Sequence, residues 1–264
     1  MKVQITAVVL TANEKDNIVR CLNSIKWCDE IILIDNSSDR TVELVNGLKL
    51  KQLRIIKDDT TDDFASLRNS ALKHAKNDWV LFIDADEEVP DKLQKEILNS
   101  IQNPQADGYY LSRRDFFLGR WLKFGETGNM KLLKLGRKKV GKWTRPVHEE
   151  WQIESTTTLN SYLNHYPHPT IAEFLSRIHR WSTIDAEVFY QQGGRANFLK
   201  IILYPIGKFF INYIVRLGFL DGMPGLIMAL MMSFHSFLTR AKLYQLNRDS
   251  CLKRRDTPDG ASRS

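Results

Sequence analysis

The alternation of apolar segments over about the first hundred residues is the feature that most constrains the fold of this chain. Short runs rich in Val, Ile and Leu alternate with segments in which apolar residues repeat at helical spacing. The predicted strands cover residues 3–10, 31–34, 53–56 and 79–83, and the predicted helices cover residues 14–27, 41–50, 64–75 and a segment that begins at Pro90. Strands that alternate with helices predict parallel βαβ units.

The predicted strands are continuous apolar runs, which is typical of strands that are covered on both faces. Sheets of this kind bind their ligands beyond the carboxyl ends of the strands. Farther along, short segments at residues 108–112, 131–135 and 151–153 predict antiparallel or mixed strands. We therefore predict an α/β fold with a doubly wound, mixed sheet.

Charge is unevenly distributed along the 264 residues, whose net charge is +7. Residues 195–264 hold 11 Lys and Arg against 4 Asp and Glu, and the preceding 194 residues hold 27 of each sign. A basic segment of this kind favours an anionic surface as its partner. Because its basic residues are embedded among Phe, Leu, Ile and Met, we expect an anionic membrane surface and no nucleic acid.

Helical patterns fill the C-terminal third of the chain. Residues 171–192 predict an amphipathic helix. Residues 198–220 place Lys200 and Lys208 on one broad flank of an apolar segment, which favours a helix in the plane of a membrane interface. Residues 222–239 carry no formal charge and reach the lower limit for a span. A re-entrant or interfacial helix is preferred there, and ordinary core packing of both helices is the alternative.

These patterns predict a division of the chain into three segments. The segments are a catalytic domain over 1–160, an amphipathic helix packing on it over 161–194, and a basic, apolar membrane-association region over 195–264. The three cysteines form no CxxC pair, which indicates a reducing compartment. The first apolar run is too short for a signal peptide, so we expect a protein that is not secreted.

The segment FIDADEE at residues 82–88 is the strongest local signal of chemistry. Because side chains alternate along a strand, Asp84 and Asp86 are expected to project the same way from a strand end. Two carboxylates there suit Mg²⁺ or Mn²⁺, and a diphosphate leaving group needs such a charge beside it. The alternative is an acidic turn that favours the next helix N-terminus.

Two further polar clusters follow predicted strands. Asp35 ends the run 31–34 and is expected to accept hydrogen bonds from a base or ribose. After the first strand, Thr11, Asn13 and Glu14 are expected to line a nucleotide pocket. The equal alternative for this cluster is that Asn13 caps a helix.

Two candidates lie outside these strand ends. Arg68 is on a predicted helix near the pocket mouth, where its planar guanidinium pairs well with phosphate oxygens, although most helical arginines are merely solvated. Glu149 and Glu150 stand beside His148 and near aromatic residues, an arrangement that suits a general base, although most Glu-Glu pairs of this kind are solvated. The alternative for this pair is a solvated surface.

The absence of GxGxxG and GxxxxGK[ST] excludes the dinucleotide Rossmann and P-loop modes of phosphate binding. His165 and His168 lie in a Pro-rich segment, for which a turn is preferred over a metal site. Two other functions remain as alternatives. A nucleotidyltransferase would favour a Gly-rich loop after the first strand, and residues 11–16 contain no Gly. A non-catalytic membrane adaptor would not need the acidic residues.

Four stretches in this order resemble glycosyltransferase family 2, which has the GT-A fold. They are ITAVVLTANEKDNIVRCLNSI, EIILIDNSSDRTVEL, ASLRNSALKHA and WVLFIDADEEVP, within a match that runs from Ile5 to about Glu150. The stretches RRDFFLGRWLKFG, KLLKL and RPVHEEW, and the tail GFLDGMPGLIMALMMSFHSFLTRAKL, resemble the subgroup of bacterial lipopolysaccharide-core β-1,4-glucosyltransferases.

The resemblance implies roles on the donor side of a site. Asp35 would contact the uracil or ribose, Asp84 would hold the ribose region, and Asp86 would bind the metal. Arg68 would act on the nucleotide side.

The resemblance also implies a base and an acceptor side. Glu149 is the best match for the acidic base, and Glu150 is the second choice because this chain has His-Glu-Glu where the family usually has a Glu-Asp pair. Arg114 and Trp121 would line the sugar and acceptor side.

The implied activity is inverting, metal-dependent transfer of a hexose from a nucleotide diphosphate sugar, with UDP as the expected nucleotide. The implied acceptor is a cell-envelope glycan or a lipid-linked molecule such as the lipopolysaccharide core. The expected location is the cytoplasm, with peripheral or monotopic attachment to the inner face of the cytoplasmic membrane.

Overall fold

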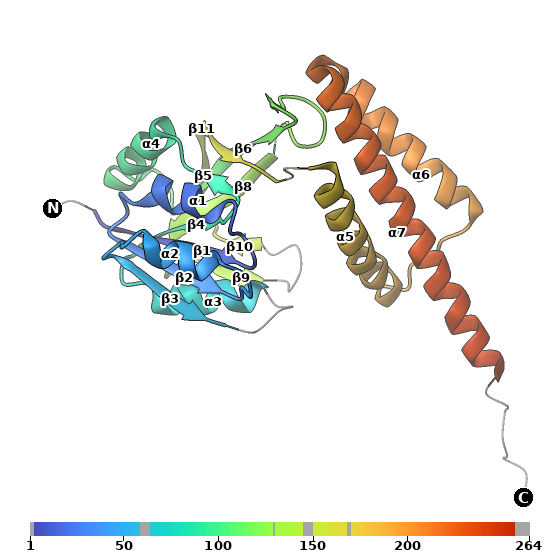
Figure 1. Cartoon of the computed structure of the whole chain (residues 1–264), viewed down its shortest axis with the longest axis horizontal. Helices are drawn as coiled ribbons and strands as arrows, with labels where there is room; N and C mark the ends of the chain where they lie inside the picture. Colours follow the sequence, from blue (N-terminus) through green and yellow to red (C-terminus); the bar gives the residue numbers. More distant parts are fainter. Residues whose placement is uncertain (1–2, 59–63, 129, 145–149, 168–169, 257–264) are drawn as a thin grey trace, which may run out of the picture. The chain divides into compact units, whose positions relative to one another are not determined.

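The computed structural model describes residues 3–58, 64–128, 130–144, 150–167 and 170–256 (Figure 1). The chain forms two compact units. The first unit comprises Met1–Phe116 and Asn129–Pro167, and the second comprises Phe117–Gly128 and His168–Ser264. The three functional segments expected from the sequence remain a prediction, because compactness alone does not assign a role to any of them.

The first unit begins with the predicted alternation of strands and helices. Its strands are β1 (Ile5–Thr11), β2 (Glu30–Asp35), β3 (Leu53–Lys57) and β4 (Trp79–Asp84), and its helices are α1 (Ile18–Ile25), α2 (Thr41–Gly47), α3 (Phe64–His74) and α4 (Asp91–Gln102). The sheet is completed by β5 (Glu87–Glu88), β6 (Gly108–Phe117), β8 (Met130–Arg137) and β11 (Thr156–His165), with β7 (Arg120–Trp121) paired to β6. A separate antiparallel pair is formed by β9 (Lys142–Thr144) and β10 (Glu150–Gln152).

The described strands of the main sheet run in the order β3-β2-β1-β4-β8-β6-β11-β5. Strand β1 pairs in parallel with β2 and β4, and β6 pairs in parallel with β11. Strand β8 is antiparallel to both of its neighbours, β4 and β6. It follows that β1 to β4, β6 and β11 all point the same way and end at one edge of the sheet. The predicted mixed, doubly wound α/β sheet is confirmed.

Alternate residues of β1 face two separate cores. Ile5, Ala7 and Val9 belong to the core that includes α1 and α4. Val8 belongs to the opposite core, which includes α3 and the β9–β10 pair. Because both faces of the strand are covered, its sequence is a continuous apolar run and not an alternating one.

Helix α1 begins at Ile18, later than the predicted residue 14. The backbone of Asn13 is left-handed, with φ of 59°, and the amides of Asn17 and Ile18 donate to the carbonyl of Glu14. A turn therefore replaces the first predicted helical turn. This turn leaves the residues after β1 at the carboxyl edge of the sheet.

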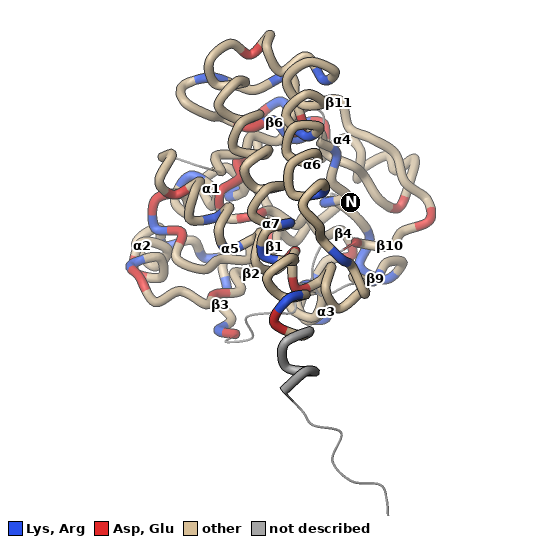
Figure 2. The backbone as a smooth tube through the Cα atoms, turned by 90° about the vertical axis from the view of Figure 1, so that its right-hand side faces the viewer, with Lys and Arg blue, Asp and Glu red and all other residues tan. Residues whose placement is uncertain are grey.

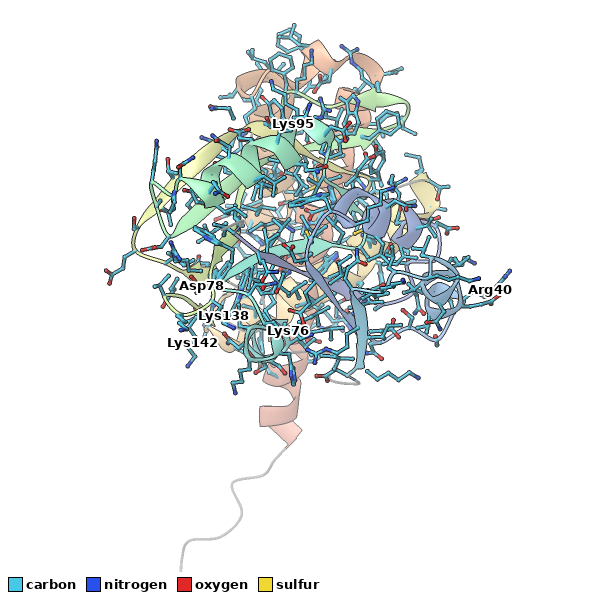
Figure 3. The ribbon with its side chains drawn as sticks, turned by 90° about the vertical axis from the view of Figure 1, so that its left-hand side faces the viewer. Arg40, Lys76, Asp78, Lys95, Lys138 and Lys142 are labelled. Carbon is cyan, nitrogen blue, oxygen red and sulfur yellow. The ribbon has the colours of Figure 1, made fainter. Side chains whose placement is uncertain are left out.

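Helix α3 is closed at its C-terminal end by Lys138. The Lys138 ammonium donates to the carbonyl oxygens of Ala75 at 2.6 Å and Lys76 at 3.3 Å. A cation is favourable at the negative end of a helix dipole. Figure 3 labels Lys76, Asp78 and Lys138 around this helix end, where the charged side chains mix both signs.

The second unit is built from long helices. These are α5 (Ile171–Gln191), α6 (Phe198–Phe210), the π-helical segment η1 (Ile211–Val215), the 3₁₀ segment η2 (Gly218–Asp221) and α7 (Gly222–Asp256). Residues 117–128, between β6 and β8, also belong to this unit. Phe117 and Leu122 of this segment pack with Phe174, Ile178 and Met228 of α5 and α7 in a common core. Two segments, 198–215 and 218–250, are long and apolar enough to cross a membrane by length and composition alone.

The predicted helix over 198–220 is interrupted. It changes to π geometry after Phe210, and Leu217 adopts a left-handed backbone with φ of 57°. Gly225 lies so close to the Gly218 carbonyl that a side chain there would collide with it. The chain reverses at this close approach. The following helix α7 extends past residue 239 and includes the basic residues Arg240, Lys242 and Arg248.

Candidate active site

Thr11 and Asp35 end adjacent parallel strands and are partners in the β1–β2 register. Both are buried, and Asp35 Oδ1 accepts the Ser37 amide at 3.2 Å. Asp35 Oδ2 and Thr11 Oγ1 have no hydrogen-bond partner among the described residues. A buried polar atom without a partner costs about 1–3 kcal/mol. These two atoms therefore suit a ligand that supplies hydrogen-bonding groups at this edge.

Asn13 joins the loops that follow β1 and β2. Its side-chain oxygen accepts the amides of Ser38 at 2.9 Å and Asp39 at 3.2 Å. The amide of Glu14 donates to Thr41 Oγ1 at 3.0 Å, at the start of α2. Asn13 therefore does not cap α1 but joins the loops after β1 and β2, and Glu14 supports the same junction.

Asp84 stands at the end of β4 between two cations. Its Oδ2 accepts Lys134 Nζ at 2.7 Å, and its Oδ1 accepts Arg68 Nη2 at 3.2 Å. Desolvation by itself raises the pKa of Asp84, but the nearby Lys134 and Arg68 charges outweigh it and hold that pKa well below its usual range. Arg68 also lies over the Trp143 ring at 4.7 Å. Arg68 is thus a fixed part of the site and not a solvated helical arginine.

Lys134 of β8 links Asp84 to a second carboxylate. Lys134 is 4% exposed, and its Nζ lies 2.6 Å from Oε2 of Glu87, which is fully buried. Glu87 Oε2 also accepts the amide of Asp84 at 2.9 Å. Burial lowers the pKa of Lys134, but Asp84 and Glu87 together raise it, so the ammonium stays charged. Lys134 therefore holds the side chain of Asp84, and Glu87 holds its backbone amide.

Asp86 contacts a different set of residues. His165, at the end of β11, has Nε2 at 3.4 Å from Asp86 Oδ2 and Nδ1 at 2.8 Å from Asp115 Oδ1. Burial lowers the pKa of His165, but the two carboxylates raise it to about 9. Asp84 and Asp86 therefore contact different residues, and a turn at residues 85–86 separates β4 from β5.

The residues around Asp86 would supply only part of the ligand shell of a divalent ion. Among the described residues, no group of three or more His, Cys, Asp or Glu is arranged to hold an ion. Asp86 and neutral His165 would supply two donors, and Asp115 would orient the imidazole as carboxylates do in metal sites. Mg²⁺ and Mn²⁺ commonly take the rest of their ligands from phosphate and water. His165 must lose its proton to bind an ion.

A cleft of about 1120 Å³ opens beside Asp84. Arg68, Asp84, Lys134 and Glu150 line it together with Trp143 and Trp151 of the β9–β10 pair. Glu150 is exposed at the start of β10. Of the two expected bases, Glu150 thus lies in the cleft wall, whereas Glu149 and its neighbour His148 lie outside the described residues.

Arg114 and Trp121 are in different units. Arg114 Nε donates to Asn164 Oδ1 at 2.7 Å, and Asn164 Nδ2 donates to Glu88 at 2.9 Å. Arg114 is therefore part of a polar network between β6, β11 and β5, and it is not among the residues that line the cleft. Trp121 is half-buried in β7 of the second unit.

Comparison with known families identifies the family of this chain. A family model described as Glycosyl transferase family 2 matches residues 6–153, which contain Asp35, Asp84, Asp86 and Glu150. The chain belongs to glycosyl transferase family 2. The sheet described above is accordingly the GT-A fold that the sequence resemblance predicted.

Curated relatives match almost the whole chain. Lipopolysaccharide core biosynthesis glycosyltransferase LpsC of Rhizobium meliloti (strain 1021) is 26% identical over 98% of both chains. An uncharacterized glycosyltransferase of Rickettsia bellii is 26% identical over 92% of this chain and 87% of its own length. A crystal structure of S. aureus TarS 1-349 in complex with UDP-GlcNAc aligns at 15% identity and a TM-score of 0.49, over 94% of this chain and 92% of that chain.

Family membership makes this chain a glycosyltransferase, so the nucleotidyltransferase and adaptor alternatives are set aside. Sequence reasoning did not identify Lys134, Glu87, Asp115 or the position of His165. Lys134 is one of two lysines in the stretch KLLKL, and nothing local distinguishes it from the exposed Lys131. The Pro residues after His165 suggested a turn, whereas His165 is the last residue of β11.

Proposed function

We propose that this chain is an inverting hexosyltransferase that uses a nucleotide diphosphate sugar, with UDP as the first nucleotide to test. The observation that carries the proposal is the line of polar groups along one sheet edge. Asp35 and Thr11 offer unsatisfied acceptors, and the Asp84 and Asp86 clusters follow on the neighbouring side. Such an edge suits a nucleoside at one end and a diphosphate at the other.

The residues around Asp84 orient the donor. Asp84 is ionised and held by Lys134 and Arg68, so it presents a fixed acceptor toward the cleft. A fixed acceptor orients a sugar hydroxyl without reorganisation during the reaction. A divalent ion bound at Asp86 and His165 would supply Lewis-acid stabilisation of the diphosphate.

The acceptor side needs one carboxylate. A base, Glu149 with Glu150 as second choice, takes the proton of the acceptor hydroxyl while its oxygen forms a bond to the anomeric carbon. The bond from that carbon to the diphosphate oxygen breaks, and the nucleoside diphosphate leaves with the electron pair. Attack opposite the leaving group inverts the anomeric centre, and the apolar walls at Trp143 and Trp151 help exclude water.

The acceptor class follows from the relatives and the C-terminal unit. The relative that matches over nearly its whole length is named for lipopolysaccharide core biosynthesis, which supports a cell-envelope glycan or lipid-linked acceptor. The two long apolar helical segments support action at a membrane surface, on its cytoplasmic face. Attachment to the membrane would bring the enzyme to a lipid-linked acceptor.

The test is release of nucleoside diphosphate from a panel of nucleotide sugars by the purified full-length protein, with and without lipopolysaccharide-core acceptors. We expect a UDP-hexose to be used and the product to have the opposite anomeric configuration. Glu149→Gln should lower the rate by roughly 10²–10⁴-fold while leaving donor binding intact. If Glu150→Gln is inactive and Glu149→Gln is active, the base is Glu150 and not Glu149. Retention of configuration would exclude the proposed mechanism.

A further inference from the structure

One face of α6 and η1 is uniformly apolar and exposed. Six large side chains along it are each between 41% and 62% exposed. They are Leu199, Ile202, Leu203, Ile206, Phe210 and Ile214. Only 6% of the segment 198–215 is buried inside the protein, although its mean hydropathy is 1.5. An apolar face of this length exceeds what a soluble surface ordinarily exposes.

Three cations of α6 and α7 are held by other groups of the second unit. Lys208 Nζ lies 2.6 Å from Glu126 of the loop 117–128. The Arg240 guanidinium of α7 lies over the Tyr204 ring at 4.5 Å. Lys242 of α7 donates to the Ser182 hydroxyl of α5 at 2.8 Å. The six side chains of the apolar face therefore carry no formal charge, and the exposed Lys200 of α6 donates to the Arg195 carbonyl at 2.8 Å.

Negative charge is nearly absent from this part of the chain. Between residues 198 and 248 the sequence has one acidic residue, Asp221, which is 1% exposed. Figure 2 shows α6 and most of α7 in tan, with a few blue positions. A surface that lacks exposed carboxylates meets no repulsion from anionic headgroups.

The loop 117–128 is bonded to the reversal between α6 and α7. Asp221 Oδ2 accepts the amides of Lys123 and Phe124, each at 2.9 Å. The Gly125 amide donates to the Arg216 carbonyl at 2.9 Å. Asp221 therefore caps two loop amides that would otherwise be unpaired, and the loop and the reversal form one substructure.

The covalent connection of this loop limits where the reversal can lie. Phe117 is the last residue of β6, and Met130 is the first residue of β8. The six Cα–Cα steps from Phe117 to Lys123 span at most ~21 Å when fully extended. The hydrocarbon core of a bilayer is ~30 Å thick. The reversal therefore cannot reach the far side of a bilayer while the sheet stays in water.

We infer that α6 and η1 lie in the plane of one leaflet of a lipid bilayer, with the Leu199–Ile214 face in the acyl boundary and neither α6 nor α7 crossing it. This inference deepens the proposed function only in placing the site at a membrane. A lipid surface is the occupant because the face carries no polar group for a protein partner to recognise, whereas specific protein interfaces have a polar rim. Insertion of apolar side chains drives the binding, and attraction between charges contributes less.

The first test measures binding of full-length protein to vesicles of phosphatidylethanolamine and phosphatidylglycerol. The triple variant Leu203→Ser, Ile206→Ser, Phe210→Ser should lose ~10²–10³-fold in partition, at roughly tenfold for each side chain withdrawn from lipid. The control is Leu118→Ser, Leu175→Ser, Tyr190→Ser, which removes apolar groups that are 38–44% exposed elsewhere in the second unit and should bind as wild type. Circular dichroism of both variants checks that they are folded.

Two results of this test would overturn the inference. One is equal binding of the folded triple variant and the wild type. The other is complete release of the wild-type protein from vesicles by high salt, which would assign the attachment to surface charge. Release of nucleoside diphosphate in detergent-free solution by the same triple variant tests transfer chemistry separately, so a failure of the site model is distinguished from a failure of lipid binding.

The second test locates the reversal by labelling. Phe219→Cys in a Cys251→Ser background places one accessible thiol there, because Cys21 and Cys28 are buried. In inverted inner-membrane vesicles, whose cytoplasmic face is outside, a membrane-impermeant maleimide should react with it fully. Reaction only after the vesicles are permeabilised would show that the helices span, and the in-plane arrangement would be wrong.

Discussion

Asp84 and Asp86 lie two positions apart in the sequence but in different chemical surroundings. Asp84 is held between Lys134 and Arg68, and its pKa is depressed by these charges. Asp86 lies beside His165, whose second nitrogen is bonded to Asp115. The two carboxylates are therefore suited to different tasks, with Asp84 a fixed acceptor and Asp86 a partner for a cation.

Activity should require a divalent ion at Asp86. Asp86→Asn removes the anionic donor, and we expect a loss of at least ~100-fold in transfer, since metal stabilisation of a leaving group contributes several kcal/mol. Titration of the protein with Mn²⁺, followed by electron paramagnetic resonance, should show the same loss without any turnover. The control Asp78→Asn, on the protein surface, should bind Mn²⁺ as wild type does. Full turnover in excess chelator would contradict this assignment.

Thr11→Val should change stability and nucleotide binding in opposite directions. The buried Thr11 hydroxyl has no partner among the described residues, so an isosteric methyl should raise the free energy of unfolding by about 1 kcal/mol. The same change removes a hydrogen bond to the ligand and should weaken UDP binding by about five- to tenfold. Chemical denaturation and calorimetric titration measure the two effects. If stability and affinity both fell, the hydroxyl would have a structural role instead.

Strand β8 is the element that brings positive charge to the site. It is antiparallel to β4 and β6, so Lys134 reaches across to Asp84 and Glu87 of the β4–β5 region. Lys131, on the same strand, is exposed. The position of the reversed strand in the sheet therefore decides which lysine is part of the buried network.

Lys134→Met should destabilise the first unit by about 3–5 kcal/mol, because it leaves buried Glu87 and its neighbour Asp84 without their shared cation. Lys131→Met removes the same charge from an exposed position of the same strand and should change stability by less than about 0.5 kcal/mol. Urea unfolding followed by near-ultraviolet circular dichroism compares the pair. The double variant Lys134→Met, Glu87→Gln should recover part of the loss, and no recovery would mean that packing, not charge, dominates.

At the scale of the whole molecule, residues 117–128 belong to the helical unit although the chain before and after them belongs to the unit that contains the sheet. The loop between β6 and β8 places Phe117 and Leu122 in the core formed by α5 and α7. Two backbone amides of this loop, those of Lys123 and Phe124, donate to the Asp221 carboxylate. Removing the helices therefore exposes part of a core that begins within the catalytic half of the sequence.

Truncation after Gly194 should give a protein that exposes apolar side chains and aggregates. The loss of α7 uncovers Phe117, Leu122, Phe174 and Ile178, which pack against Met228. We expect the truncated protein to bind a fluorescent hydrophobic dye and to aggregate at concentrations where the full chain in mild detergent is monodisperse. Size-exclusion chromatography with light scattering measures this. A monodisperse truncation with an unchanged melting temperature would show that the loop does not depend on α7.

The sequence by itself determined the architecture of the first unit and the edge of the sheet at which its candidate ligand-binding acids lie. Continuous apolar runs and helical periodicity are local properties, so the strands, the helices and the acids at the strand ends could be predicted from them. Asp35, Asp84 and Asp86 were identified in this way. The predicted start of α1 at residue 14 was wrong, because the left-handed backbone at Asn13 depends on hydrogen bonds from a loop 25 residues away.

Only the tertiary structure decided the electrostatics of the site. Lys134 and His165 approach Asp84 and Asp86 from 50 and 79 positions farther along the chain, on strands whose order in the sheet has no local signature. A lysine or histidine can stay in such a buried place only when carboxylates surround it, and that condition depends on which strands become neighbours. The pairing of Lys208 with Glu126 was likewise invisible in the sequence, where Lys208 belonged to a cationic flank, because helix periodicity cannot show that a distant loop folds back onto that helix.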